Sequence, residues 1–402
     1  MKLCIVIPAL DEEKSIEKII VRSLEARDEI IKNTDVDAVE ITVVSDGSTD
    51  RTVEIATEYK DQINLIVFEK NKGYGAAIKQ GWLESDAELL SFLDADGTCD
   101  PNFFIELCNQ VTRSESDVAL GCRLNKDSKM PLTRRFGNTM FSLLLTYLSS
   151  EKVKDTASGM RVVRRTILRE LLPLPDGLHF TPAMSARALL SDQIRISEKD
   201  MPYEERDGES KLHIWKDGVR FLNVIMKTAV LYRPNRLLSV AGFVCFLVAL
   251  LLMIGPIMHY VKVQMLEDWM IYRFTVSNTV ALLSALFFSA SYLSETIVAM
   301  SLSAVPNKPV RGSLIYKLYT SSLIWVLVTL CLVLGVSLVA ESLFQRITEG
   351  VTTEHWSRYI SMTFLVTFAS ILSVTKILAQ ILRLIADRMS YLKSSQFSSY
   401  SK

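Results

Sequence analysis

The sequence has no excess of charge of either sign and little that could bind a transition metal. Its 45 lysine and arginine residues balance its 45 aspartate and glutamate residues. Nucleic-acid-binding domains are usually strongly basic, so this balance argues against a nucleic-acid partner. The six cysteines include no C-x-x-C pair, and the four histidines have no ligand spacing. These absences argue against a zinc centre or a dithiol redox site, and we expect reduced, mostly buried cysteines.

The first residues lack the pattern of a signal peptide. Residues 2–7 form a short apolar run that ends at Pro8, with no small-residue cleavage site after it. We expect this run to be the first β-strand of a folded domain.

Hydrophobic residues make up 49% of the chain, and many of them lie in long uncharged stretches of its second part. These stretches are residues 237–258, 274–294, 318–340 and 359–375. About 20 apolar residues cross about 30 Å of hydrocarbon, so we expect four transmembrane helices. Glu295 and Lys376 lie in or near these stretches, and such residues reach the membrane surface, contact lipid headgroups or pair helices.

The stretches suggest four regions along the chain. We expect an N-terminal α/β domain over residues 1–210, a juxtamembrane interfacial helix over 211–235, a four-helix transmembrane domain over 236–385 and a tail over 386–402. Lysine and arginine are frequent before the first stretch, between the second and third, and in the tail. Because such residues favour the cytoplasmic side, we expect an integral membrane protein whose N-terminal domain and C-terminus are cytoplasmic.

The N-terminal region alternates between strand-like and helix-like patterns. Apolar runs at residues 2–7, 39–45, 63–68 and 88–93 are separated by segments with helical spacing at 15–27, 52–59 and 75–84. This alternation predicts an α/β fold with a mainly parallel sheet. Ligands of such sheets bind at the carboxyl ends of the strands.

Polar and glycine-rich clusters follow each of these four runs. They occupy residues 8–13, 46–52, 71–75 and 94–97. One such cluster alone can be a turn or a helix cap. Four clusters at equivalent positions predict a binding site. Asp94 and Asp96, at alternate positions after a strand, can aim two carboxylates into one crevice and suit Mg²⁺ or Mn²⁺, although a solvated acidic turn is the alternative.

Together with residues 155–161 and 208–211, these clusters resemble glycosyltransferase family 2 enzymes of the GT-A fold. Within that family the chain resembles the polyprenyl- and dolichyl-phosphate glycosyltransferases, represented by dolichol-phosphate mannose synthase. The resemblance implies a membrane-bound inverting enzyme that moves a sugar from a GDP- or UDP-linked donor to a polyprenyl or dolichyl phosphate, with Mg²⁺ or Mn²⁺. The family usually has an acid where this chain has Ser45, which leaves Asp46 to contact the nucleoside.

The resemblance also implies roles for particular residues. The nucleoside would be bound by Pro8, Ala9, Glu12, Asp46, Lys72 and Gly73. The cation and diphosphate would be held by Asp94, Ala95 and Asp96, of which the two aspartates are the metal ligands. Arg206, Ser210 and Lys211 would close over the donor phosphates.

The expected acceptor is a phosphate dianion at a membrane surface, and guanidinium groups pair well with phosphate. The candidates are Arg123, Arg134 and Arg135, with Arg123 and Arg135 slightly preferred, together with Ser158. A phosphate is already ionised near pH 7, so no strong base is needed. Asp155 would orient the acceptor, act as a weak base, or simply cap its loop.

Two further segments, residues 138–148 and 214–231, combine apolar residues at helical spacing with nearby basic residues. They predict helices that lie on the bilayer surface, and core packing is the alternative.

Rival functions remain for the chain. They are transfer to a lipid-linked saccharide or polysaccharide, or a non-catalytic scaffold that binds nucleotide-sugars. Assembly into a homo-oligomer is left open.

Overall fold

The computed structural model describes residues 1–125, 128–149, 151–191, 193–204, 213–302, 314–349 and 355–393. The chain divides into two compact units, Met1–Tyr232 and Arg233–Lys402. The first unit therefore includes the helix α8 (Ile214–Tyr232), which we expected to be a separate juxtamembrane region. Each unit is described by itself.

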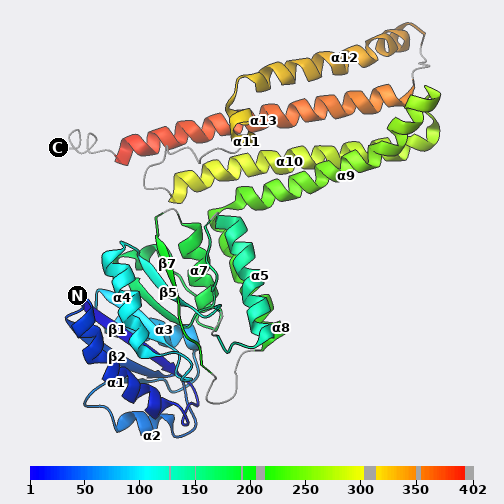
Figure 1. Cartoon of the computed structure of the whole chain (residues 1–402). Helices are drawn as coiled ribbons and strands as arrows, with labels where there is room; N and C mark the ends of the chain where they lie inside the picture. Colours follow the sequence, from blue (N-terminus) through cyan, green and yellow to red (C-terminus); the bar gives the residue numbers. More distant parts are fainter. Residues whose placement is uncertain are drawn as a thin grey trace, which may run out of the picture. The chain divides into compact units, whose positions relative to one another are not determined.

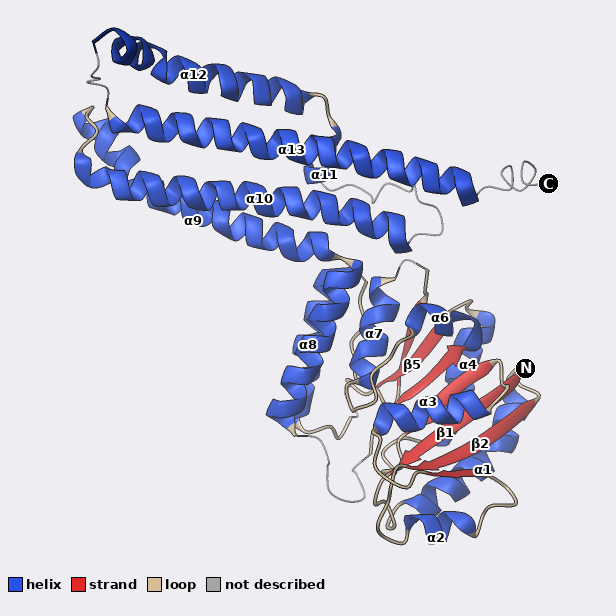
Figure 2. Cartoon of the chain, turned by 180° about the vertical axis from the view of Figure 1, so that it is seen from behind, coloured by secondary structure: helices blue, strands red, loops and turns tan. Residues whose placement is uncertain are grey.

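The first unit is built on a seven-stranded sheet with the strand order β3-β2-β1-β4-β6-β5-β7 (Figure 2). The strands are β1 (Lys2–Ala9), β2 (Ala38–Ser45), β3 (Asn64–Val67), β4 (Leu89–Leu93), β5 (Val118–Cys122), β6 (Met160–Arg164) and β7 (Ile196–Asp200). β1 pairs in parallel with β2 and β4, whereas β6 is antiparallel to β4 and β5. The predicted mainly parallel α/β sheet is confirmed, and the antiparallel strand β6 is an addition to it.

Helices cover both faces of this sheet. They are α1 (Ile16–Asn33), α2 (Thr52–Thr57), α3 (Tyr74–Glu84), α4 (Phe104–Arg113), α5 (Leu132–Ser149), α6 (Leu168–Leu171), α7 (Phe180–Leu190) and α8. Alternate residues of β1 point to opposite faces: Ile5 joins the core with α1 and α4, and Val6 joins the core with α3 and α7. Burial on both faces explains the continuous apolar run that marks this strand in the sequence.

The described part of the second unit contains four long helices, α9 (Pro234–Val263), α10 (Ile271–Leu302), α12 (Leu323–Glu349) and α13 (Trp356–Lys393), and the short α11 (Leu314–Thr320). All four long helices are apolar enough and long enough to cross a membrane, as the sequence predicts. α10 packs against α9 and α13, and α13 packs against α12, so the helices form a row (Figure 1). α13 continues to Lys393, beyond the boundary expected at residue 385.

Serines at intervals of seven residues join α9 to α10. Each of three serines of α10 donates a hydrogen bond of 2.8–2.9 Å to a backbone carbonyl of α9, and the acceptors are also seven residues apart. The pairs are Ser277 with Ala249, Ser284 with Gly242 and Ser291 with Asn235. The hydroxyls therefore satisfy their own polarity while they bring two apolar helices into contact.

Lys376 pairs helices. Its Nζ donates hydrogen bonds of 2.7, 3.0 and 3.1 Å to the carbonyl oxygens of Tyr319, Thr320 and Ser321 at the end of α11. Carbonyls at the end of a helix lack partners within the helix, and a cation there is stabilising. The structure thus shows the joining of helices, one of the roles considered for this lysine.

Candidate active site

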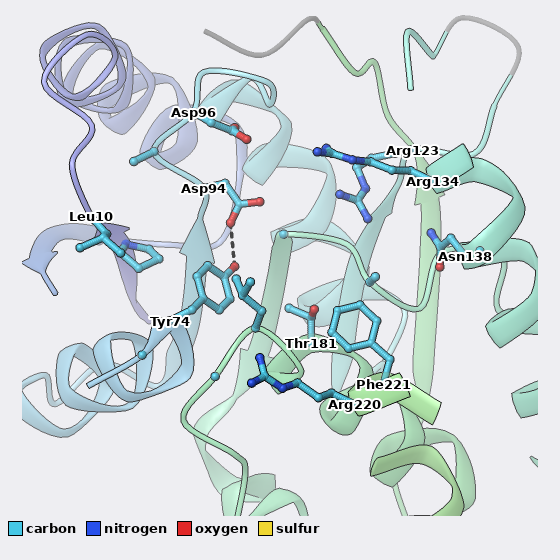
Figure 3. Close-up of a pocket in the computed structure, with 18 of the residues that line it drawn as sticks. Leu10, Tyr74, Asp94, Asp96, Arg123, Arg134, Asn138, Thr181, Arg220 and Phe221 are labelled. Atoms are coloured by element: carbon cyan, nitrogen blue, oxygen red, sulfur yellow. Dashed lines mark hydrogen bonds between the residues drawn. The ribbon is translucent and has the colours of Figure 1, made fainter. Parts of the chain in front are cut away.

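A cavity of about 510 Å³ opens in the first unit at the carboxyl ends of the parallel strands. The loops after β1, β2 and β4 form one wall, and parts of α5, α7 and α8 form the other. Figure 3 shows Asp94 and Asp96 on the first wall and Arg123, Arg134 and Asn138 on the facing wall. The cavity lies where ligands of parallel α/β sheets bind, as the sequence predicts.

The loops after β1 and β2 hold each other. The Asp11 Oδ1 accepts a hydrogen bond of 2.7 Å from the Thr49 N–H, and the Asp11 N–H donates to Ser48 Oγ at 3.1 Å. The Glu12 N–H donates to Thr52 Oγ1 at 2.8 Å. These contacts fix the loop that carries Glu12 and that follows Pro8 and Ala9 at the end of β1. Pro8, Ala9 and Glu12 all line the cavity.

Asp46 joins the loop after β2 to the loop after β3. Its two carboxylate oxygens accept hydrogen bonds from the N–H groups of Lys72 at 2.7 Å and Gly73 at 2.9 Å. Burial raises the pKa of Asp46, and these two N–H groups partly oppose that rise. Asp46 and Gly73 line the cavity. The ammonium of Lys72 instead lies 4.2 Å from the centre of the Phe68 ring.

The two aspartates after β4 are held by different donors. The Tyr74 hydroxyl donates to Asp94 Oδ1 at 2.7 Å. Asp96 Oδ1 accepts hydrogen bonds from the Thr98 hydroxyl at 2.7 Å and the Thr98 N–H at 3.2 Å. Both carboxylates line the cavity, as does Ala95 between them. Both side chains thus face the same cavity.

The donor set of this acid pair fits a hard cation. Over the part of the chain that the structure describes, no group of three or more His, Cys, Asp or Glu residues could hold a metal ion. Two carboxylates suit Mg²⁺ or Mn²⁺, which commonly take their remaining oxygen ligands from phosphates and water. Zinc and copper sites use histidine or thiolate ligands, which this pair does not offer.

Arg123, Asp155 and Asn138 form a buried network behind the opposite wall. The Arg123 guanidinium contacts both oxygens of Asp155, at 2.7 and 2.9 Å, and the Asn138 amide donates to Asp155 Oδ1 at 2.6 Å. The side chain of Asp155 is fully buried, and Arg123 is 12% exposed. Burial opposes ionisation of Asp155, but the guanidinium outweighs it, so the pKa of this carboxyl is lowered.

This geometry does not fit the weak-base role considered for Asp155. The carboxylate does not line the cavity, and its two oxygens accept hydrogen bonds from Arg123 and Asn138. Arg123 and Asn138 do line the cavity. Asp155 therefore fixes the two residues that face the cavity and does not face it itself.

Arg161 holds the adjoining loop, residues 156–158, through its backbone carbonyls. This fully buried guanidinium donates to the carbonyl oxygens of Ser158 at 3.1 Å and Thr156 at 2.9 Å. Burial lowers its pKa to about 10, so it remains charged at neutral pH. Ser158 is itself fully buried and bonds to Met160, and it does not line the cavity as an acceptor contact would.

The two neighbouring arginines at the start of α5 point to different places. Arg134 lines the cavity. Arg135 lines a second cavity with Lys154 and Asp200, and its guanidinium donates to the Asn125 carbonyl at 3.3 Å. The two side chains separate because successive residues of a helix lie about 100° apart around its axis. The preference for Arg135 over Arg134 as an acceptor contact stays a prediction. Arg206, Ser210 and Lys211 lie outside the described residues.

The outward faces of α5 and α8 are apolar. On α5, Leu132 is 81% exposed and Phe136 75%; on α8, Trp215 is 89% exposed and Val219 67%. Their inward faces meet through Phe141 and Phe221, whose ring centres are 6.0 Å apart. The interfacial and core-packing alternatives therefore describe opposite faces of the same two helices.

Several residues of the cavity were not anticipated. They include Leu10, Tyr74, Asn138, Thr181, Arg220 and Phe221. Tyr74 belongs to a cluster that the sequence marks, and Asn138 follows the arginine pair by one helical turn. Arg220 and Phe221 lie on α8, and Arg220 forms a 3.0 Å ion pair with the buried Asp217. A basic residue among the apolar residues of that helix is the signal that could have located Arg220, and Phe221 has no comparable signal in the sequence.

The six cysteines are free, and all except the half-buried Cys245 are buried, as expected.

Comparison with known proteins gives the family. The sequence model described as "Glycosyl transferase family 2" matches residues 4–172. The chain is 32% identical over 246 residues to the low-salt glycan biosynthesis hexosyltransferase Agl6 of Haloferax volcanii, covering 60% of this chain and 56% of that protein, little more than half its length. It is 29% identical to the undecaprenyl-phosphate 4-deoxy-4-formamido-L-arabinose transferase of Photorhabdus laumondii, covering 63% and 76%.

A solved structure shows a weaker likeness. The glucosyl-3-phosphoglycerate synthase of Mycobacterium tuberculosis, crystallised with Mn²⁺, uridine diphosphate and glucosyl-3-phosphoglycerate, is 18% identical with a TM-score of 0.44. The alignment covers 57% of this chain and 80% of that one.

A dolichyl-phosphate hexose transferase of Haloferax volcanii has a higher sequence identity, 31% over 195 residues. The match covers 47% of this chain and 80% of that protein. The chain belongs to glycosyltransferase family 2, in agreement with its GT-A-like sheet and the motifs at its strand ends.

Proposed function

We propose that the chain is a membrane-bound inverting glycosyltransferase that moves a sugar from a GDP- or UDP-linked donor to a polyprenyl or dolichyl phosphate. One observation carries the proposal: a single cavity has an aspartate pair on one wall and Arg123, Arg134 and Asn138 on the facing wall. The first wall suits a cation and a diphosphate, and the second suits a phosphate acceptor. The relatives named for dolichyl and undecaprenyl phosphate support this acceptor class.

The donor would lie along the loops after β1, β2 and β4. Pro8, Ala9 and Asp46 line the end where the nucleoside would bind, and Asp94 and Asp96 lie next to them, where the diphosphate would follow. A divalent cation held by these two carboxylates would stabilise the charge that develops on the departing diphosphate.

The acceptor would enter against the facing wall. Arg134 and Arg123 supply guanidinium groups, and Asn138 supplies an amide. An oxygen of the acceptor phosphate attacks the anomeric carbon while the bond from that carbon to the diphosphate oxygen breaks, which inverts the configuration. The nucleoside diphosphate leaves with the bonding electron pair.

The carboxylates of the cavity support an acceptor that needs no base. Among the described lining residues, the carboxylates are Glu12, Asp46, Asp94 and Asp96, all on the donor wall. A sugar hydroxyl would need a base to remove its proton, whereas a phosphate near pH 7 has already lost it. This favours a lipid phosphate over the hydroxyl of a lipid-linked saccharide.

The exposed faces of α5 and α8 support action at a bilayer surface. Each helix lines the cavity with one face and exposes large apolar side chains on the other. Amphipathic helices of this kind lie at the boundary between headgroups and acyl chains, where the phosphate of a prenyl lipid is found. The distribution of lysine and arginine favours the cytoplasmic side.

Transfer can be tested with membranes that contain the full chain. They are incubated with radiolabelled UDP-glucose or GDP-mannose, then with a wider set of UDP- and GDP-sugars, in the presence of Mn²⁺ and a polyprenyl phosphate. Label should appear in the organic phase as a product that mild acid releases. Label in a long polymer would favour a polysaccharide synthase. Absence of lipid-linked label with every donor would contradict the proposal.

A further inference from the structure

Tyr74 holds one oxygen of the first aspartate of the pair. Its hydroxyl donates a hydrogen bond of 2.7 Å to Asp94 Oδ1. Figure 3 shows the second oxygen of Asp94 turned away from this hydroxyl. A carboxylate with one oxygen held by a fixed donor can no longer rotate freely about its Cβ–Cγ bond.

The ring of Tyr74 is itself fixed by other rings. Its centre lies 6.4 Å from that of Phe92 and 6.5 Å from that of Phe180, both in edge-to-face arrangements. Such contacts are favourable for aromatic pairs and limit the positions of the ring. The hydroxyl is therefore presented to Asp94 before any ligand binds.

Gly159 leaves the space that the other oxygen of Asp94 occupies. A Cβ atom added at Gly159 would lie 1.9 Å from Asp94 Oδ2, far inside van der Waals contact. Gly159 also lines the cavity. The tyrosine on one side and the bare backbone on the other thus set a single orientation of this carboxylate.

We propose that Tyr74 is a positioning residue that directs Asp94 Oδ2 toward the divalent cation of the donor complex. This inference rests on the proposed function and adds to it. Asp94 would then offer one oxygen to the cation, and phosphate oxygens and water would be further ligands. The aromatic hydroxyl acts only through Asp94 and does not touch the cation.

The test measures Mn²⁺ binding to the full chain by electron paramagnetic resonance, in detergent with UDP and separately with GDP. Tyr74→Phe keeps the ring packing and removes only the hydroxyl. A hydrogen bond to a charged group typically affects equilibria by about tenfold, so we expect Mn²⁺ to bind Tyr74→Phe about tenfold more weakly. Tyr59→Phe is the matched control, because its hydroxyl bonds to Glu17 outside the cavity and its loss should leave Mn²⁺ affinity unchanged.

A double-mutant cycle separates positioning from a general structural effect. In Asp94→Asn, the added Tyr74→Phe change should have almost no further effect on Mn²⁺ affinity, because the hydroxyl acts through the carboxylate. Gly159→Ala should weaken Mn²⁺ binding more than Tyr74→Phe does, and thermal unfolding of each variant shows whether it is folded.

The outcomes distinguish this inference from the proposed function. If the wild-type chain binds Mn²⁺ with either nucleotide and Tyr74→Phe binds it equally well, the role of Tyr74 is refuted and the proposed function stands. If Tyr74→Phe weakens Mn²⁺ binding equally in the wild-type chain and in Asp94→Asn, the role of Tyr74 is also refuted. If the wild-type chain binds no Mn²⁺ with either nucleotide, the cation site of the proposed function fails first.

Discussion

The two units bury polar side chains in different ways. In the first unit, the fully buried Asp155 and Arg161 lie under the wall of one cavity, where each is held by several hydrogen bonds. In the second unit, Ser277, Ser284 and Ser291 are buried along the length of a helix pair, each with one bond to a backbone carbonyl. These two examples contrast a buried ion pair and guanidinium in the first unit with small neutral hydroxyls distributed along a helix pair in the second.

This difference has energetic consequences. A buried ion pair that loses one partner leaves an unpaired charge, which is costly in a medium of low polarity. A serine that loses its hydroxyl leaves only a carbonyl that has a partner within its own helix, and measured effects in membranes are small. Substitutions should therefore have large, localised effects in the first unit and small, additive effects in the second.

The largest effect is expected for the acid pair. Asp96→Ala should reduce transfer of labelled sugar by at least about 10²–10³-fold, because the charge of the departing diphosphate would lose its stabilisation. The measurement is lipid-linked label in membranes with matched amounts of protein. Asp86→Ala is the control, since its 86% exposed side chain pairs with Lys2 far from the cavity lining. Turnover that survives in Asp96→Ala would contradict the cation site.

The next largest effect is expected for the buried ion pair of Arg123. Asp155→Asn removes the charge but keeps the shape, and breaking such a pair costs about 3–5 kcal/mol. Thermal or denaturant unfolding of the first unit reports the loss. Asp200→Asn, in an exposed pair with Lys154 at 3.4 Å, should cost less than about 1 kcal/mol. Equal stability of the two variants would argue against the network.

The same pair predicts a dependence on pH. The pKa of Asp155 is lowered in the folded protein, so the unfolded chain takes up this proton first as the pH falls. The stabilisation is therefore complete at neutral pH and is lost as the pH falls through and below the ordinary aspartate range. Asp155→Asn should lack this component, so its stability should fall less steeply with acid than that of the wild type.

A smaller effect is expected for the acceptor wall. Arg134→Ala should raise the KM for polyprenyl phosphate by about tenfold with little change in the KM for the donor, because one charge-assisted contact is lost. Arg135→Ala, one residue along but outside this cavity, should change either KM less than twofold. A larger increase of the KM for polyprenyl phosphate in Arg135→Ala than in Arg134→Ala would show that Arg135, and not Arg134, contacts the acceptor.

The smallest effect is expected in the membrane unit. Ser284→Ala should lower the free energy of unfolding in micelles by about 0.6 kcal/mol, the average for such interhelical hydrogen bonds. Ser370→Ala is the control, since this hydroxyl bonds only within its own helix, to Val366. Transfer activity should be unchanged in both variants. If Ser284→Ala lowered the free energy of unfolding by several kcal/mol, the serine hydroxyls would not act as independent contacts.

Much of the first unit could be predicted from the sequence because its signals are local. The buried run at residues 2–7 and the cluster at Asp94 and Asp96 each fall within a few residues, and parallel strands bring such clusters together. The antiparallel direction of β6 is not local information, since a buried apolar strand has the same composition in either direction.

The parts of the site that were not predicted depend on contacts between distant segments. Asp155 has the residue type of a base, and only its 2.7 Å contact with Arg123 shows that it is an anchor. The choice between Arg134 and Arg135 depends on the rotation of α5, which the sequence near its start does not determine. The serine spacing of α10, by contrast, is present in the sequence, but counting uncharged residues alone does not detect it.

The seven-residue interval has a geometric consequence for the membrane unit. Seven residues fall about 20° short of two full turns of a straight α-helix, so a contact line with this period drifts around the helix surface. α9 and α10 can keep all three serine contacts only if they wind around each other with a left-handed supercoil. The two helices then incline to each other, and at 30 and 32 residues both are longer than the about 20 residues that cross a bilayer.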